Sequence, residues 1–176
     1  MVLDVPHFRQ KDPLWADEKV GARRQAGTIS EIGCTLCCVA MVFGYHGIAV
    51  TPKELNDFLN ANDGYTETGL LRWDKCVEYA RGRVRLKYNG DPDTTLMDEN
   101  LAVGNPLIVR VYLNGPTQHW VVVVGRSGRD YLVEDPLHES AAPVSLSRYG
   151  AVDALRVFEK VAAAESADGL KPAPSG

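Results

Sequence analysis

The stretch SEIGCTLCCVAMVFGYHG (residues 30–47) carries three of the chain's four cysteines, directly after a glycine and at the head of an apolar run. Apolar residues recur at helical spacing from Cys34 to about Tyr45, and no proline interrupts them, which predicts a buried helix. Cys34 therefore begins the predicted helix, and Cys37 and Cys38 follow one turn later.

More helices are predicted downstream. Residues 50–61 (VTPKELNDFLNA) have Thr51 as N-cap, Pro52 at the first helical position and Glu54 three residues after the cap, the pattern of a capping box. Residues 93–104 predict another, shorter helix. Residues 1–29, which are rich in Pro and Gly, are expected to be irregular, with one or two short strands.

Residues 69–82 (GLLRWDKCVEYARG) predict an amphipathic helix that ends near Gly82. Its apolar side chains fall on one stripe, whose members are Leu70, Trp73, Cys76, Val77 and Ala80. A stripe of this kind packs against a core, so Cys76 is expected to be a buried hydrophobic residue.

The second half of the chain changes character. Residues 106–113, 119–126 and 130–135 are short runs rich in Val, Ile and Tyr, and RSGRD (residues 126–130) forms a turn between the last two. Helices followed by strands with hairpin connections favour an α+β fold, with N-terminal helices packed on an antiparallel β-sheet. A doubly wound parallel sheet fits this order less well.

The length and composition predict one folded domain over residues 1–161. From residue 162 the sequence is Ala, Ser, Pro and Gly without an apolar period, so residues 162–176 are expected to be a disordered tail or linker.

Charge and hydropathy exclude several partners. The net charge is −4 and no basic run is longer than Arg23-Arg24, so neither nucleic acid nor an anionic membrane surface is expected to bind. The longest apolar run has about five residues, far fewer than the ~20 that span a bilayer. No signal peptide is visible, and cysteines without a disulfide framework favour a reducing compartment, although the tail would also suit a linker in a larger secreted chain. The oligomeric state is not indicated.

The cysteines differ in what their positions predict. Cys34-x-x-Cys37 resembles half of a zinc site, but the only cysteine outside the cluster is the isolated Cys76, so no metal is expected. Cys37 and Cys38 are expected to pack in the core. Cys34 is different, because unpaired N–H groups and the helix dipole favour a thiolate at a helix N-terminus.

A reactive thiol needs a base, and His119 is the best-placed histidine. It opens the strand HWVVVVG, and Asp135 closes the strand DYLVED. A hairpin centred near Ser127 would place the two residues directly opposite each other, with Cβ atoms ~5 Å apart. An aspartate there would hold the imidazole in one tautomer, while Glu134 would point to the other face. His46 would lie ~18 Å from Cys34 along the helix, and His138 is expected to be a loop residue.

Taken in order, VPHFRQKDPLW, TISEIGCTLCCVAMVFGYHG, VTPKELNDFL, HWVVVVG and YLVEDP resemble the papain-like cysteine peptidases related to the bacteriocin-processing (double-glycine leader) type. The resemblance covers roughly residues 4 to 160. It implies that Cys34 is the nucleophile, His119 the base, and Asp135 the residue that orients the base. It also implies that Gln10 contributes to the oxyanion hole. A peptide or protein substrate is implied, without a cofactor or metal.

Alternatives remain open at this stage. The same groups could pass an acyl group to an amine instead of water. The domain could bind without turnover, or Cys34, Cys37 and Cys38 could form a thiol redox or zinc module. The last alternative arises because the chain reads Gly-Cys-Thr-Leu-Cys-Cys where the family commonly reads Gly-Cys-Gly-Pro-Thr.

Overall fold

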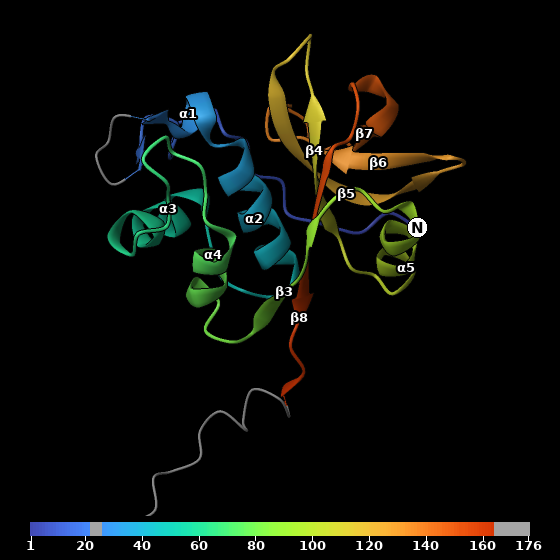
Figure 1. The fold of residues 1–176 in the computed structure, drawn as a ribbon, viewed down its shortest axis with the longest axis horizontal. Helices are drawn as coiled ribbons and strands as arrows, with labels where there is room; N and C mark the ends of the chain where they lie inside the picture. The colour runs from blue at the N-terminus through green and yellow to red at the C-terminus, as the bar shows by residue number, and fades with distance from the viewer. Residues whose placement is uncertain (22–25, 164–176) are drawn as a thin grey trace, which may run out of the picture.

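The computed structural model describes residues 1–21 and 26–163. Within these residues, a layer of helices covers one face of an antiparallel sheet, and a single helix covers the opposite face (Figure 1). The helical layer contains α1 (Ile29–Ile32), α2 (Cys34–Tyr45), α3 (Pro52–Ala61) and α4 (Trp73–Tyr79), and the helix on the opposite face is α5 (Thr94–Ala102). The predicted α+β architecture is confirmed.

In the described part of the chain, the main sheet has six strands in the order β3-β8-β4-β5-β6-β7. They are β3 (Val84–Gly90), β4 (Leu107–Tyr112), β5 (Gln118–Ser127), β6 (Asp130–Glu134), β7 (Val144–Ser145) and β8 (Ala154–Lys160), with the short helix η1 (Leu146–Arg148) after β7. The sequence predicted β4, β5 and β6 but not β3 or β8. Strand β8 comes from the end of the domain and lies between β3 and β4, so its pairing is entirely long-range.

Helix α2 begins at Cys34, as predicted, and forms the centre of the helical layer. Its residues 36–43 are all buried, because α3 packs on one side of the helix and β5 on the other. Phe43 stacks edge-on against Phe158 of β8, with ring centroids 5.2 Å apart. The helix that begins at Cys34 is thereby fixed to the sheet.

The capping box of α3 is confirmed: the Glu54 backbone N–H donates to Thr51 Oγ1 at 3.2 Å, and the Thr51 N–H donates to Glu54 Oε2 at 2.8 Å. The predicted helix over residues 69–82 is shorter than expected. Residues 66–71 form a turn, in which the Leu70 N–H donates to Thr66 Oγ1 and Gly69 has a φ of 84°. Side-chain bonding and positive φ both oppose a helix there.

Leu70 consequently lies outside α4, and 67% of its surface is exposed. The rest of the predicted stripe behaves as expected around Cys76, which is fully buried. The assignment of Leu70 to the core face of the helix is therefore wrong.

The hairpin of β5 and β6 has a different register from the predicted one. Ser127 pairs with Asp130 across a two-residue turn in which Gly128 has a φ of 62°, and a bulge follows between Val123 and Gly125. Two-residue hairpin turns require positive φ, which glycine adopts without strain. The turn is centred beyond Ser127, so the predicted centre is wrong.

In the observed register, Asp135 lies just outside the strand. Val122 pairs with Glu134, the last residue of β6, while His119 pairs with Val111 of β4. His119 and Asp135 are therefore not cross-strand partners, contrary to prediction.

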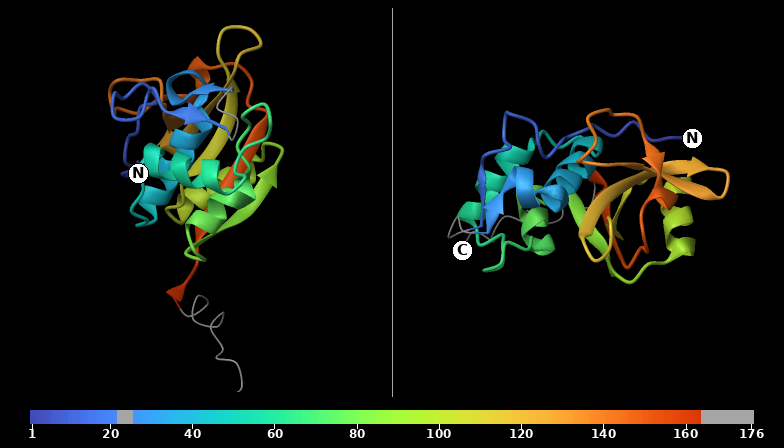
Figure 2. Two further views of the ribbon diagram at one scale, coloured as in Figure 1. Left: turned by 90° about the vertical axis from the view of Figure 1, so that its left-hand side faces the viewer. Right: turned by 90° about the horizontal axis from the view of Figure 1, so that it is seen from above.

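The N-terminal segment is irregular, with the short strands β1 (Lys19–Val20) and β2 (Gly27–Thr28) as expected. Residues 1–18, here called the N-terminal arm, run from the sheet across to the helical layer (Figure 2). Of the predicted tail, residues 164–176 lie outside the described residues. Within the described ranges, no helix is both long and apolar enough to cross a membrane.

Candidate active site

Cys34 is the first residue of α2 and the only cysteine of the chain that is not fully buried. Gly33 directly precedes it with a φ of −85°, an ordinary value, so no special backbone conformation is required there. Space is the constraint instead: a Cβ at position 33 would lie 2.5 Å from the carbonyl oxygen of Ile29. The glycine lets α1 pack tightly against the start of α2.

His119 and Asp135 meet in the interior. His119 Nε2 lies 2.7 Å from Asp135 Oδ1, and each side chain is only 3% exposed. Two further donors hold the carboxylate, since the Leu137 N–H donates to Oδ1 at 2.8 Å and the Tyr149 hydroxyl donates to Oδ2 at 2.5 Å. The predicted contact between His119 and Asp135 is thus present, but Asp135 reaches it from the loop after β6 and not from a paired strand.

The ionisation of the site is coupled. Burial raises the pKa of the Cys34 thiol, but the hydrogen bond and charge of His119 outweigh it and leave this pKa below its ordinary value. Burial lowers the pKa of His119, but interactions with Asp135 and Cys34 raise it to about 9. Burial also opposes ionisation of Asp135, yet hydrogen bonding to His119 holds its pKa low. Together these shifts favour a thiolate beside an imidazolium at neutral pH.

Gln10 is buried at 3% exposure on the N-terminal arm. Its Nε2 donates to the carbonyl oxygen of Ser30 at 2.9 Å, which ties the arm to α1, four residues before Cys34. Its Oε1 is buried without a hydrogen-bond partner. Because a primary amide has two N–H groups and Ser30 accepts one, the second remains available for another acceptor.

The other cysteines lie in the core. Cys37 and Cys38 are fully buried, and burial raises the pKa of both thiols well above the ordinary value. Cys38 Sγ donates to the carbonyl oxygen of Trp120 at 3.3 Å, and burial also raises the pKa of Cys76. In the described part of the chain, no three His, Cys, Asp or Glu side chains are grouped as metal ligands.

A cavity of about 230 Å³ opens beside Cys34. Apolar and aromatic side chains line it, among them Ile32, Tyr65, Leu70 and Trp120. This position explains the exposure of Leu70, which forms part of the cavity wall on the turn before α4.

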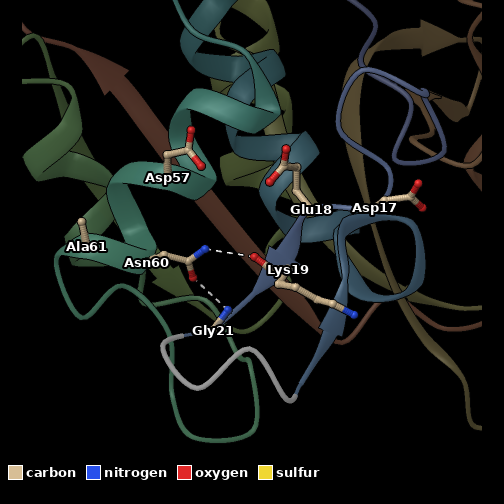
Figure 3. Close-up of a pocket in the computed structure, with 7 residues that line it drawn as sticks. All are labelled: Asp17, Glu18, Lys19, Gly21, Asp57, Asn60 and Ala61. Atoms are coloured by element: carbon tan, nitrogen blue, oxygen red, sulfur yellow. Dashed lines mark hydrogen bonds between the residues drawn. The ribbon is translucent and has the colours of Figure 1, made fainter.

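A larger hollow of about 440 Å³ lies between β1 and α3 (Figure 3). Asn60 joins the two elements there: its Nδ2 donates to the carbonyl oxygen of Lys19, and its Oδ1 accepts from the Gly21 N–H. Asp17, Glu18 and other polar groups line the hollow, and among the described residues no cysteine or histidine does. Its chemistry does not match that of the Cys34 site.

Tyr149 and Glu134 are site neighbours that the sequence did not reveal. Tyr149 contacts Asp135 across 14 positions of chain, and no local pattern indicates this contact. Glu134 binds His7, a histidine to which no role was assigned. His46 is the C-cap of α2. His138 lies in a loop, as expected.

Comparisons with protein families and with solved structures both find peptidases. The profile of the Peptidase C39 family matches residues 28–149, more than half of the chain. Among curated proteins, no significant match was found.

Two solved structures are similar in fold. One, from Bacillus anthracis, is described as a C39-like peptidase; it has a TM-score of 0.57 and 14% identity, covering 91% of this chain and 98% of that one. The other is the peptidase domain of Streptococcus ComA, a bi-functional ABC transporter involved in a quorum-sensing pathway, with a TM-score of 0.54 and 20% identity, covering 73% of this chain and 91% of that one. Both confirm the predicted papain-like α+β fold.

Proposed function

Since the chain belongs to the peptidase C39 family and is a cysteine peptidase, we propose that Cys34 is its nucleophile, with His119 as the base and Asp135 as the residue that orients the base. The family match also confirms the resemblance read from the sequence. The observation that carries the proposal is the buried pair of His119 and Asp135, whose side chains lie 2.7 Å apart. Interaction with His119 also lowers the pKa of the Cys34 thiol below its ordinary value.

In this proposal, each nitrogen of His119 has its own task. Nε2 faces Asp135, so Nδ1 is the nitrogen that holds the proton taken from Cys34. The thiolate attacks the carbonyl carbon of the peptide bond, and the imidazolium then protonates the leaving amine. Water, deprotonated by the imidazole, attacks the resulting thioester, and this step releases the acid and restores the thiol.

The tetrahedral intermediate carries a negative charge on the former carbonyl oxygen. We place two donors against it: the free N–H of the Gln10 side-chain amide and the backbone N–H of Cys34 at the start of α2. The cavity beside Cys34 supplies an apolar wall for the side chains of a peptide substrate.

The redox and zinc alternatives are less well supported. Both need Cys37 or Cys38 as a thiolate, but burial raises the pKa of each thiol well above the ordinary value. Cys34 alone combines partial exposure with a lowered pKa.

The test is brief, limiting iodoacetamide treatment of the native protein near pH ~6, where ordinary thiols are almost fully protonated. Peptide mapping should find alkylation selectively at Cys34, slowed in His119→Ala and unchanged in the matched histidine control His138→Ala. Turnover of a peptide library should disappear in Cys34→Ala and persist in Cys76→Ala. Equal, slow labelling of all four cysteines would overturn the proposal.

A further inference from the structure

The N-terminal arm carries Gln10, and it is held at both ends. Near its start, the Leu3 N–H donates to the Val124 carbonyl at 2.8 Å, which docks the arm on β5. Near its end, the Ser30 N–H donates to the Ala16 carbonyl at 2.9 Å, and the Ile29 N–H donates to the Glu18 carbonyl at 3.0 Å, which attaches the arm to α1. Gln10 therefore lies on an irregular segment whose position depends on individual contacts rather than on a helix or strand.

Between these points the His7 ring binds the segment that ends β6. Nδ1 lies 2.7 Å from Glu134 Oε2, and Nε2 lies 2.9 Å from the carbonyl oxygen of His138. The side chains of His7 and Glu134 are only 8% and 6% exposed. We call His7, Glu134 and the His138 carbonyl the His7 clamp.

The partners of the ring define its charge. A carbonyl oxygen can only accept, so Nε2 carries a proton, and a carboxylate on Nδ1 favours a second proton there. The hydrogen bond to Glu134 accordingly raises the pKa of His7, against burial and the nearby charge of Arg9, both of which lower it. The clamp is therefore a buried imidazolium–carboxylate pair.

The clamp lies beside both halves of the proposed catalytic machinery. Glu134 directly precedes Asp135, and the Gln10 backbone N–H donates to the carbonyl of Pro136 at 3.0 Å. One short segment, residues 134–138, thus contains Asp135 and anchors the arm that carries the proposed oxyanion donor.

We propose that His7 is a positioning residue for the peptidase reaction. Its hydrogen bonds to Glu134 and the His138 carbonyl fix the arm, so that the Gln10 side chain lies where it can donate to the oxyanion. The inference rests on the proposed function of Gln10. His7 touches no reacting atom, so its effect passes through the arm.

The first test separates positioning from thiol activation. His7→Gln should lower kcat about 10- to 100-fold, since small misplacements of a catalytic group have effects of this size. KM should change little. The pH profile of Cys34 alkylation should be unchanged, because displacement of iodide from iodoacetamide forms no oxyanion. Lys11→Ala, an exposed side chain on the same arm, is the matched control and should behave as wild type.

A double-mutant cycle gives the second test. Gln10→Ala should lower kcat roughly 10²- to 10³-fold, as loss of an oxyanion donor does. Adding His7→Gln to Gln10→Ala should lower kcat no further, because His7 then has no donor left to place. An equal, independent loss in both backgrounds would overturn the proposal, as would a parallel loss of Cys34 alkylation. His7→Lys, which keeps a cation beside Glu134, should recover part of kcat.

Amide hydrogen exchange tests, without any measurement of turnover, whether His7 fixes the arm. His7→Gln should speed amide exchange in residues 5–12 and 134–138, and Lys11→Ala should not. If Cys34 is not selectively alkylated and the protein turns over no peptide, the proposed function fails. Faster amide exchange in His7→Gln would still establish the clamp in that case. Unchanged exchange in an active His7→Gln variant would refute the clamp alone.

Discussion

Asp135 accepts a hydrogen bond from His119 at 2.7 Å although the two residues are not partners in the β5–β6 hairpin. The contact arises because β6 ends at Glu134 and the chain then turns, with the His138 N–H bonded to the Asp135 carbonyl at 3.0 Å. Within this turn, hydrogen bonds from the Leu137 N–H and the Tyr149 hydroxyl fix the carboxylate.

We expect Asp135→Asn to make the protonated form of His119 less stable. The charge and hydrogen bond of Asp135 help to raise the pKa of His119 to about 9, so their removal should lower this pKa. The alkaline limb of the pH profile of kcat/KM, which reports the imidazolium that protonates the leaving amine, should move down by roughly 1 to 3 pH units. A profile identical to wild type would show that Asp135 does not act on His119.

The four thiols should differ in reactivity in the folded protein only. Cys34 has a lowered pKa and partial exposure, whereas burial raises the pKa of Cys37, Cys38 and Cys76. We expect native alkylation to proceed fastest at Cys34 and to become equal for all four in denaturant. The measurement is peptide mapping at several reaction times, and fast native labelling of Cys37 would contradict the burial argument.

The His7 clamp should make stability depend on pH. The pKa of His7 is raised in the folded protein above its ordinary 6.5, so the folded state binds the proton more tightly. The stabilisation is fully present below about pH 6.5 and is lost as pH rises through the folded pKa. Urea unfolding should therefore show His7→Gln as most destabilised at low pH, with the difference from wild type shrinking as pH rises. A difference that grew with pH would contradict the assignment of an imidazolium.

Gly33→Ala should disturb the start of α2. The added Cβ would lie 2.5 Å from the Ile29 carbonyl oxygen and 2.6 Å from Ile29 Cγ2, so α1 or Cys34 must move. Overpacking of this kind costs about 1 to 3 kcal/mol. We expect a lower urea midpoint together with slower Cys34 alkylation near pH ~6. Full stability with unchanged alkylation would show that the backbone relaxes without cost.

The local sequence determined the elements whose signals are local. Residue periodicity identified α2 and its start at Cys34, and the capping box identified α3, because both patterns act through neighbours within one or two turns of helix. Runs of Val and Ile identified β4, β5 and β6 for the same reason.

The tertiary structure decided what depends on distant parts of the chain. It set the register of the hairpin through Gly128 and the bulge, and it placed β8 inside the sheet. It also brought Tyr149 to Asp135 and His7 to Glu134. The two side-chain contacts join residues that no local sequence pattern connects. They form because the carboxylates of Asp135 and Glu134 are buried in the folded protein, where a charged group needs hydrogen-bond partners.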